Sequence, residues 1–399
     1  MNTRLQVEHP VTEMITGVDI VEQMIRIAAG HTLSPRTQAE VKLNGWAIES
    51  RVYAEDPLRG FLPSIGTLKR YVEPSGEGVR VDSGVVEGGE ISIHYDPMIS
   101  KLITYGATRD EALAHMRKAL DGYVIRGLTH NINFLRSLCD HPRFIAGKLT
   151  TNFIPEEYPQ GYKGAKLTKD DVLALVASAV IVYAQMLRQQ TSISGKQRTF
   201  DADAYVASTL SKLVVGFGAG ASEAQSFDVS VRTSGAQGQL SMDIVGQNNA
   251  EHGGVSKRGV VVESSYKRGD HVFSSKVDGR DYTLQVVASS DGSPKLTLSF
   301  AGSSFPLEIR SPRQSELLKY MPLKEVLDTS KLVVSPMPGA VFSVKVKVGD
   351  EVAPGQEVAV VEAMKMQNAL RATNAGKVKA VHVKKGQTVV ADQVLIELE

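Results

Sequence analysis

An imperfect internal repeat runs from residue 339 to residue 399 and limits what this part of the chain can fold into. Valines that alternate with other residues between glycine-containing turns predict short antiparallel strands. Two such halves can form a flattened barrel or sandwich, because each half can cover the apolar face of the other. Residues 37 positions apart are identical in the pairs Gly339 and Gly376, Val341 and Val378, Val344 and Val381, Val346 and Val383, Gly349 and Gly386, Val352 and Val389, Gln356 and Gln393, and Glu362 and Glu399.

Lys365 lies where the two halves of the repeat meet. It is part of the sequence Glu-Ala-Met-Lys-Met at residues 362–366. The strand pattern on both sides predicts a tight hairpin, with Lys365 projecting from its turn. An exposed amine on a rigid support suits chemistry in which another enzyme must reach the amine and attach a group to it. By composition alone Lys365 would be an ordinary surface lysine, and it is the surrounding repeat that favours a special role.

Length and composition limit the remaining possibilities. A chain of 399 residues with 42% hydrophobic residues predicts two or three domains with well-formed cores. The formal net charge of +1 gives no bulk electrostatic reason to bind nucleic acid or a membrane surface. The single cysteine, Cys139, excludes an intrachain disulfide framework and is expected to be a buried structural thiol rather than a reactive one.

The ends and the apolar runs of the sequence carry no recognisable targeting signal. The first residues lack the apolar core of a signal peptide and the Arg- and Ser-rich character of a transit peptide. The longest uncharged apolar run, residues 172–187, is shorter than the roughly 20 residues that a membrane span needs. A buried helix is therefore expected there.

The middle block, about residues 159–328, predicts an antiparallel barrel around a central helix. Its helix, Lys169–Gln189, is apolar on nearly every face in its middle, so other elements should surround it. Short strands with turn signals between them follow, at Phe227–Arg232, Leu240–Ile244, Val260–Glu263, His271–Val277, Tyr282–Val287, Lys295–Phe300 and Phe305–Ile309. No spacing in this block suggests catalysis, which indicates a structural or partner-binding role.

The first block, residues 1–158, predicts a mixed α/β domain, and residues 331–399 form the third, all-β block. In the first block a helix is expected at 17–29, and strands are expected at 46–53, 66–72 and 91–94. A further helix should begin after Thr108, which forms a capping box with Glu111, and reach about Leu120. Residues around 312–330 have moderate helical character and would tether the third block.

Polar residues alternate at the beginning of the chain. On a strand or an extended loop, Asn2, Arg4, Gln6 and Glu8 would share one face. Such a face could hold a small oxyanion such as bicarbonate, with an arginine fork, a neutral amide donor and a carboxylate base. Spacing alone favours the simpler alternative, a surface strand with an Arg–Glu salt bridge.

The third block resembles the biotinyl carrier domain of biotin-dependent carboxylases. The resemblance rests on Ala363-Met364-Lys365-Met366 and on Ser335-Pro336-Met337-Pro338-Gly339 at the beginning of the block. It implies that biotin is attached to Lys365 by a biotin protein ligase. Lipoyl domains share the fold type, but their lysine usually has an acidic neighbour and no flanking methionines.

The first block resembles the C-terminal part of biotin carboxylase, an ATP-grasp enzyme. The matching segments are Asn2-Thr3-Arg4-Leu5-Gln6-Val7-Glu8-His9-Pro10, Glu49–Pro57 and Tyr95–Lys101. Residue by residue, the resemblance implies that Arg4, Gln6 and the backbone of Val7 hold bicarbonate. It implies that Glu8 is the general base, that Arg51 stabilises the biotin enolate, and that Asn2 belongs to the metal site. For Asp96, a role at the strand end and a role in supporting the site are equally expected.

The segments Asn44–Ala47, Phe61–Gly66, Asp82–Gly84 and Tyr123–Gly127 look like those of one group of these enzymes. Along its whole length the chain resembles the α subunits of propionyl-CoA carboxylases. This implies ATP- and bicarbonate-dependent carboxylation of biotin, then transfer to propionyl-CoA on a partner β subunit to give methylmalonyl-CoA. The middle block would dock that subunit, as a BT-type domain in a hetero-oligomer. Carboxylases for 3-methylcrotonyl-CoA or several acyl-CoAs are the alternatives. The location implied is the mitochondrial matrix in a eukaryote and otherwise the cytoplasm.

The sequence departs from the carboxylase pattern at its beginning. The glycine-rich phosphate loop, the ATP lysines and the main metal glutamates of the family would precede Met1, and no other phosphate-loop motif is present. ATP with Mg²⁺ or Mn²⁺ is therefore expected only in a longer enzyme, and the chain by itself is expected to be inactive. A biotin carrier and assembly module without catalysis is the alternative from a different functional class.

Overall fold

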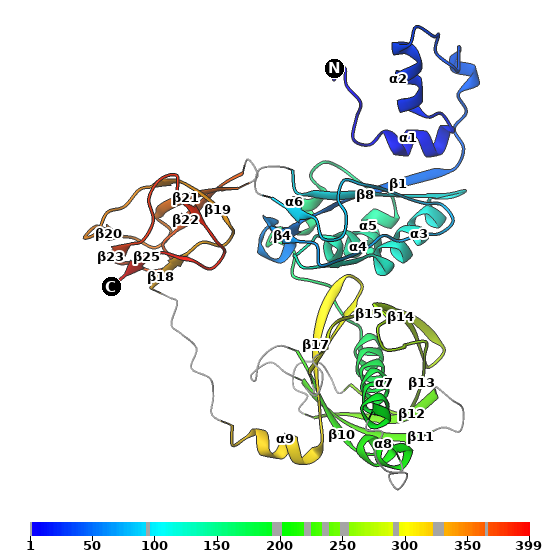
Figure 1. Cartoon of the computed structure of the whole chain (residues 1–399), viewed down its shortest axis with the longest axis vertical. Coiled ribbons are helices and arrows are strands. Elements are labelled where there is room, and N and C mark those ends of the chain that lie inside the picture. Colours follow the sequence, from blue (N-terminus) through cyan, green and yellow to red (C-terminus); the bar gives the residue numbers. More distant parts are fainter. Residues whose placement is uncertain are drawn as a thin grey trace. The chain divides into compact units, whose positions relative to one another are not determined.

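The structure is a computed structural model that describes residues 2–92, 96–193, 202–218, 225–233, 239–247, 255–289, 295–321, 331–363 and 366–399 (Figure 1). Two compact units are distinguished. One comprises residues 164–323, and the other comprises residues 1–163 together with 324–399.

The first region is built on a three-stranded antiparallel sheet in the order β1-β8-β6. Its strands are β1 (Trp46–Tyr53), β6 (Val79–Ser83) and β8 (Met98–Gly106). Short pairs flank it: β2 (Glu55–Asp56) with β3 (Leu62–Pro63), β4 (Gly66–Thr67) with β7 (Glu90–Ile91), and β5 (Arg70–Val72) with β9 (Val124–Arg126). The helices are α1 (His9–Thr16), α2 (Ile20–Ala28), α3 (Arg109–Gly122), α4 (Ile132–Asp140), α5 (Pro142–Ile145) and α6 (Phe153–Glu157), with one-turn helices at Gln38–Glu40 and Pro57–Arg59.

The two faces of this sheet have different chemistry. Val52 and Leu102 point to the face covered by α3, where they are fully buried with Leu113, Met116 and other apolar side chains. Because side chains alternate along a strand, Glu49, Arg51 and Lys101 belong to the opposite face. Helix α1 lies against β1 and β8. The α3 core thus supports a sheet whose other face is charged.

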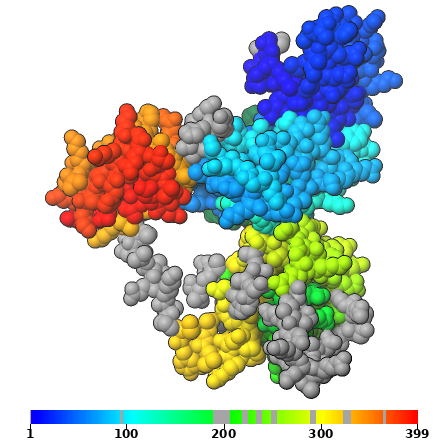
Figure 2. Space-filling view, viewed as in Figure 1, coloured from blue at the N-terminus to red at the C-terminus, as the bar shows by residue number. Residues whose placement is uncertain are grey.

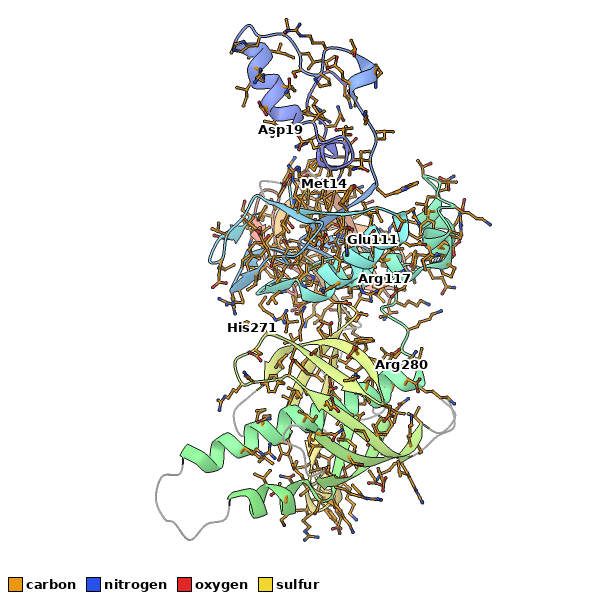
Figure 3. The ribbon with its side chains drawn as sticks, turned by 90° about the vertical axis from the view of Figure 1, so that its right-hand side faces the viewer. Met14, Asp19, Glu111, Arg117, His271 and Arg280 are labelled. Carbon is orange, nitrogen blue, oxygen red and sulfur yellow. The ribbon has the colours of Figure 1, made fainter. Side chains whose placement is uncertain are left out.

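Several local predictions for the first region are confirmed. Strand β1 has the predicted bounds, and α3 begins after Thr108, whose hydroxyl accepts a hydrogen bond from the Glu111 N–H at 3.2 Å. Figure 3 shows Glu111 and Arg117 on α3. Cys139 is buried, and burial raises the pKa of its thiol to about 11.

Other local predictions for this region are confirmed only in part. The helix predicted at 17–29 begins only at Ile20, because Gly17 ends α1 in the left-handed conformation, at φ 72°, and Asp19 then caps α2 (Figure 3). On α2 the apolar side chains of Met24 and Ile25 are 48% and 66% exposed. The strand predicted at 66–72 is divided into β4 and β5, and residues 93 and 94 of the predicted strand 91–94 lie outside the described residues.

The second unit is a closed antiparallel barrel, which confirms the predicted architecture. Helix α7 (Lys169–Ile193) contributes fully buried residues such as Val176 and Val180 to the barrel core (Figure 1). Each strand pairs with the next and the last pairs with the first. The strands are β10 (Leu213–Phe217), β11 (Gln225–Thr233), β12 (Gln239–Gln247), β13 (Ser256–Ser264), β14 (Val272–Val277), β15 (Arg280–Ser289), β16 (Lys295–Phe300) and β17 (Ser303–Arg310), with helices α8 (Ala202–Leu210) and α9 (Pro312–Leu318).

Helix α7 is the one described helix that is long and apolar enough to cross a membrane. Two thirds of its most apolar window are buried inside the barrel, as expected for the core helix that the sequence predicts. Ser178 on α7 and Ser275 on β14 are both fully buried, and their hydroxyl groups are 2.8 Å apart. This bond satisfies two polar groups that would otherwise cost free energy in the apolar core.

The C-terminal region consists of two four-stranded sheets with the orders β18-β25-β23-β20 and β22-β21-β19-β24. It forms the orange and red body in Figure 2. A shift of 37 residues carries the strands of the first sheet onto those of the second, which confirms a folded repeat. The strands are β18 (Leu332–Val334), β19 (Gly339–Val344), β20 (Glu351–Val352), β21 (Glu357–Ala363), β22 (Met366–Arg371), β23 (Gly376–Val381), β24 (Thr388–Val389) and β25 (Val394–Leu398).

Hydrogen bonds between the halves are also repeated. Gly349 donates its N–H to the Val378 carbonyl at 2.8 Å, and Gly386 donates to the Val341 carbonyl at 2.7 Å. Each donor and each acceptor of the first bond has its repeat equivalent in the second. The two halves are therefore related by an approximate two-fold axis, and their glycines at positions 349 and 386 both have positive φ, at 96° and 84°.

Gly339 and Gly376 provide a matched test of this packing. A Cβ at Gly339 would lie 2.5 Å from the Glu362 carbonyl oxygen, whereas one at Gly376 would lie 3.1 Å from the Glu399 carbonyl oxygen. We expect Gly339→Ala to destabilise the C-terminal region by about 1–3 kcal/mol, and Gly376→Ala to have a smaller effect. Amide hydrogen exchange of β21 in both variants measures the difference, and equal protection in the two would contradict it.

Candidate functional site

Glu8 and Arg51 meet where α1 begins above strand β1. Oε2 of Glu8 is 3.2 Å from Nη2 of Arg51, although the residues are 43 positions apart. Arg51 also donates from Nε to Oε1 of Glu49 at 3.0 Å. Glu49 is 8% exposed, Arg51 40% and Glu8 57%. One nitrogen of the guanidinium is therefore held from inside the protein, and another contacts a carboxylate that solvent and substrates can reach.

The segment before α1 does not form the strand that would make its polar side chains alternate. It bends at Arg4 and turns at Val7–Glu8, so Glu8 directly precedes the helix. Nη1 of Arg4 donates to the Leu5 carbonyl at 3.4 Å, and Nε2 of Gln6 donates to the Arg4 carbonyl at 3.1 Å. Of the predicted site residues, Glu8 and Arg51 are thus in contact, while the side chains of Arg4 and Gln6 contact local backbone.

The turn at Val7 is held by a lysine that sequence reasoning assigned no role. Nζ of Lys101 donates to the Val7 carbonyl at 3.3 Å and lies 3.0 Å from Oδ2 of Asp82. Asp82 in turn accepts from Nε of Arg80 at 2.8 Å. Lys101 falls within the Tyr95–Lys101 segment, but only the register of the sheet and the position of α1 reveal these contacts.

The charges around Arg51 shift the pKa values of neighbouring groups. Burial alone would lower the pKa of Arg51, but the hydrogen bond and negative charge of Glu49 outweigh it and raise that pKa. Burial, with the charge of Asp96, raises the pKa of Tyr53. The guanidinium of Arg51 therefore carries a positive charge.

Asp96 lies two residues before the beginning of β8. Its Oδ1 accepts a hydrogen bond from the Met98 N–H at 2.9 Å, which is a contact that shapes the strand end.

Among the described residues, no group of three or more His, Cys, Asp or Glu side chains is placed to hold a metal ion. The role of Asn2, which is exposed, in a metal site stays a prediction.

Asn131 is a second residue whose importance the sequence did not reveal. The Asn131 side chain bonds the backbone of β1 on both sides of Val52. Its Oδ1 accepts from the Tyr53 N–H at 2.9 Å, and its Nδ2 donates to the Arg51 carbonyl at 3.2 Å. Asn131 is 5% exposed, so it holds the end of β1, with Arg51, from within the core.

The other candidate residue, Lys365, lies outside the described residues, as does Met364. The strands on either side are described. Ala363 at the end of β21 pairs with Met366 at the beginning of β22, and pairing continues to Glu357 and Arg371. This pairing confirms the predicted hairpin strands.

We predict that Asn131→Ala lowers the free energy of unfolding of the first region by about 1–3 kcal/mol, because it leaves buried backbone groups unpaired. The single tryptophan, Trp46 in β1, reports the unfolding of this region by fluorescence during a urea titration. The control is Asn133→Ala, where the lost bond joins Oδ1 to the N–H of the next residue, Phe134. Equal midpoints for the two variants would contradict the role of Asn131.

Family models match the chain in consecutive ranges. The carbamoyl-phosphate synthase L chain, ATP binding domain matches residues 1–36, and the biotin carboxylase C-terminal domain matches residues 49–156. The propionyl-coenzyme A carboxylase BT domain matches residues 175–324, and the biotin-requiring enzyme domain matches residues 331–398. The BT-domain match covers most of the barrel unit. The match to the biotin-requiring enzyme domain indicates covalently bound biotin.

Similar proteins were found among curated sequences and solved structures. The propionyl-CoA carboxylase alpha chain of Ruegeria pomeroyi is 42% identical over 100% of this chain and 58% of that protein. The mitochondrial alpha chain of Homo sapiens is 43% identical over 100% of this chain and 52% of that protein. The biotin carboxylase domain of Hydrogenobacter thermophilus 2-oxoglutarate carboxylase is 47% identical over 41% of this chain and 36% of that one, with a TM-score of 0.40.

The chain spans a little over half the length of these two alpha chains. The domain matches follow one another in the order expected for such a protein. Identity of 42–43% extends along the whole chain rather than being confined to one domain. These matches show that the chain belongs to the biotin-dependent carboxylase family, among the α chains of acyl-CoA carboxylases.

Proposed function

We propose that this chain carries biotin on Lys365 and supplies part of the site at which ATP and bicarbonate carboxylate that biotin. The biotin-requiring enzyme match over residues 331–398 supports the first part, since Lys365 lies between the paired strands β21 and β22. The contact of Glu8 with Arg51 at 3.2 Å supports the second part, because it joins a proton acceptor to a fixed cation.

In this proposal Arg4, Gln6 and the backbone of Val7 hold bicarbonate, and Glu8 accepts its proton. A guanidinium can bind two oxygens of a planar anion side by side, and a glutamine amide adds a neutral donor. The present contacts of Arg4 and Gln6 are to exposed backbone carbonyls, so both side chains can exchange them for bicarbonate oxygens. Glu8 is exposed and directly precedes α1, which leaves its carboxylate open to the same anion.

Arg51 acts on the biotin side of the site. Biotin, when bound, would supply a ureido nitrogen as the acceptor of the carboxyl group. Arg51 would donate hydrogen bonds to the neighbouring ureido oxygen as that oxygen gains negative charge, and such a donor generally contributes about 2.7–4 kcal/mol to catalysis. Glu49, buried and bonded to Nε, keeps the guanidinium plane in one orientation.

The substrate and partners are proposed from the relatives. We propose that the carboxyl group passes to propionyl-CoA on a carboxyltransferase β subunit, which gives methylmalonyl-CoA. The BT-domain match supports docking of that subunit by the barrel in a hetero-oligomer. A methylcrotonoyl-CoA carboxylase alpha subunit of Dictyostelium discoideum is 34% identical, so that acyl-CoA is the second choice. The compartment would be the mitochondrial matrix in a eukaryote and the cytoplasm in a bacterium.

The remaining parts of the proposal concern domains and cofactors. We propose domain limits of 1–158, 159–328 and 331–399. A biotin protein ligase would load Lys365. ATP and Mg²⁺ or Mn²⁺ would bind in the complete enzyme, since the ATP-binding match in this chain is limited to residues 1–36.

The matches to the BT domain and to the biotin-requiring enzyme domain also fit a second candidate function, that of a biotin carrier and assembly module with no catalysis of its own. The carrier repeat and the barrel would then be its working parts. The two candidates differ in whether Glu8 and Arg51 affect chemistry.

Attachment is tested by replacing the proposed lysine. We expect Lys365→Ala to abolish the streptavidin signal of the chain after incubation with biotin, ATP and a biotin protein ligase. Lys347→Ala, at an exposed lysine of the same region, should keep the full signal. An unchanged signal in Lys365→Ala would exclude this residue as the attachment site.

Catalysis is tested by bicarbonate-dependent release of phosphate from ATP. We expect the biotinylated chain alone to release none, and an enzyme completed with the ATP-binding region of a relative to be active. Glu8→Gln should abolish that activity while leaving biotin attachment intact. If the completed enzyme is inactive, or if Glu8→Gln is as active as wild type, the carrier module is the better description.

A further inference from the structure

A row of charged side chains crosses the sheet below the beginning of α1. Lys101 on β8 is paired in register with Arg51 on β1 and with Asp82 on β6. The three residues therefore lie side by side on one face of the sheet. The Lys101 side chain is only 13% exposed, with its ammonium 3.0 Å from Oδ2 of Asp82.

The same ammonium reaches the turn that carries the proposed base. Nζ of Lys101 donates to the Val7 carbonyl at 3.3 Å. That carbonyl and the N–H of Glu8 belong to one planar peptide unit, so holding the oxygen also limits the orientation of the Glu8 backbone. The Glu8 carboxylate is in turn 3.2 Å from Arg51, the neighbour of Lys101 in the row.

A second connection joins the row to the middle of α1. Arg80 bonds Asp82 through Nε and Glu13 of α1 through Nη1, both at 2.8 Å. Glu13 is 9% exposed and also accepts the Ile20 N–H at 2.8 Å, which fixes the step from α1 to α2. Burial opposes the ionisation of Asp82, but the hydrogen bonds of Arg80 and Lys101 outweigh it and hold its pKa below the ordinary value.

We propose that Lys101, held by Asp82, is a positioning residue for the proposed reaction with bicarbonate. It sets the Val7–Glu8 turn against the sheet so that the carboxylate of Glu8 faces the guanidinium of Arg51. Lys101 acts through the backbone of Val7 and is not itself a catalytic group. This inference rests on the proposed function, because it assigns Lys101 a part in the work of Glu8.

The substitution Lys101→Met tests the inference, since methionine has a similar reach and no charge. In the completed, biotinylated enzyme we expect kcat with saturating bicarbonate to fall about 100-fold, the loss typical of a small misplacement of a reacting group. The KM for ATP should stay unchanged, and Lys101→Arg should recover part of the rate. Lys118→Met, at an exposed position on α3, should be fully active.

Lys101→Met could lose activity for a reason other than a misplaced Glu8, so a second test measures the backbone directly and does not depend on catalysis. Hydrogen exchange of the 399-residue chain should become faster at residues 7–16 in Lys101→Met and in Asp82→Asn, while the amides of α3 stay protected. Faster exchange throughout the first region would mean a general folding role and would overturn the inference.

The failure of this inference can be told apart from the failure of the proposed function. If Glu8→Gln abolishes activity while Lys101→Met and Lys118→Met are equally active, the role of Lys101 is wrong and the proposed function stands. If the completed wild-type enzyme shows no bicarbonate-dependent activity, the proposed function is wrong, and the positioning role of Lys101 falls with it.

Discussion

The site in the first region depends on the register of three antiparallel strands. Because β1, β8 and β6 are aligned with Lys101 between Arg51 and Asp82, three charged side chains lie in one row. A slip of one residue in β8 would move Lys101 to the face covered by α3. The apolar packing on that α3 face, where Val52 and Leu102 are fully buried, therefore determines the charged arrangement on the other face.

Regular patterns made much of the fold predictable. Residue types alternate clearly along strand β1 and the barrel strands. The run of apolar residues in α7 can be buried only if other elements surround the helix. Strand β10, Leu213–Phe217, was missed because it is buried at four successive positions and shows no alternation. The polar residues before α1 were given an alternating face because their spacing allows it, whereas the chain bends at Arg4 and turns into a helix after Glu8.

The candidate site was predictable only in part, for a different reason. Glu8 and Arg51 each lie within a recognisable motif, and the structure brings the two residues together. The contacts of Asn131 with β1 span about 80 positions, and those of Lys101 with Val7 span 94. Neither residue type is unusual where it stands, so nothing in the local sequence indicates a contact that depends on how separate elements pack.

The two-fold repeat of the C-terminal region has a consequence for how an attached group would be presented. Under the 37-residue shift, β18 corresponds to β22 and β25 to β21, so the first and last strands of the region are equivalent to the hairpin strands around residues 364 and 365. The two pairs belong to different sheets. If a group were attached at those residues, the chain that enters through β18 would join one sheet and the group would be carried by the other, with one shared apolar core between them.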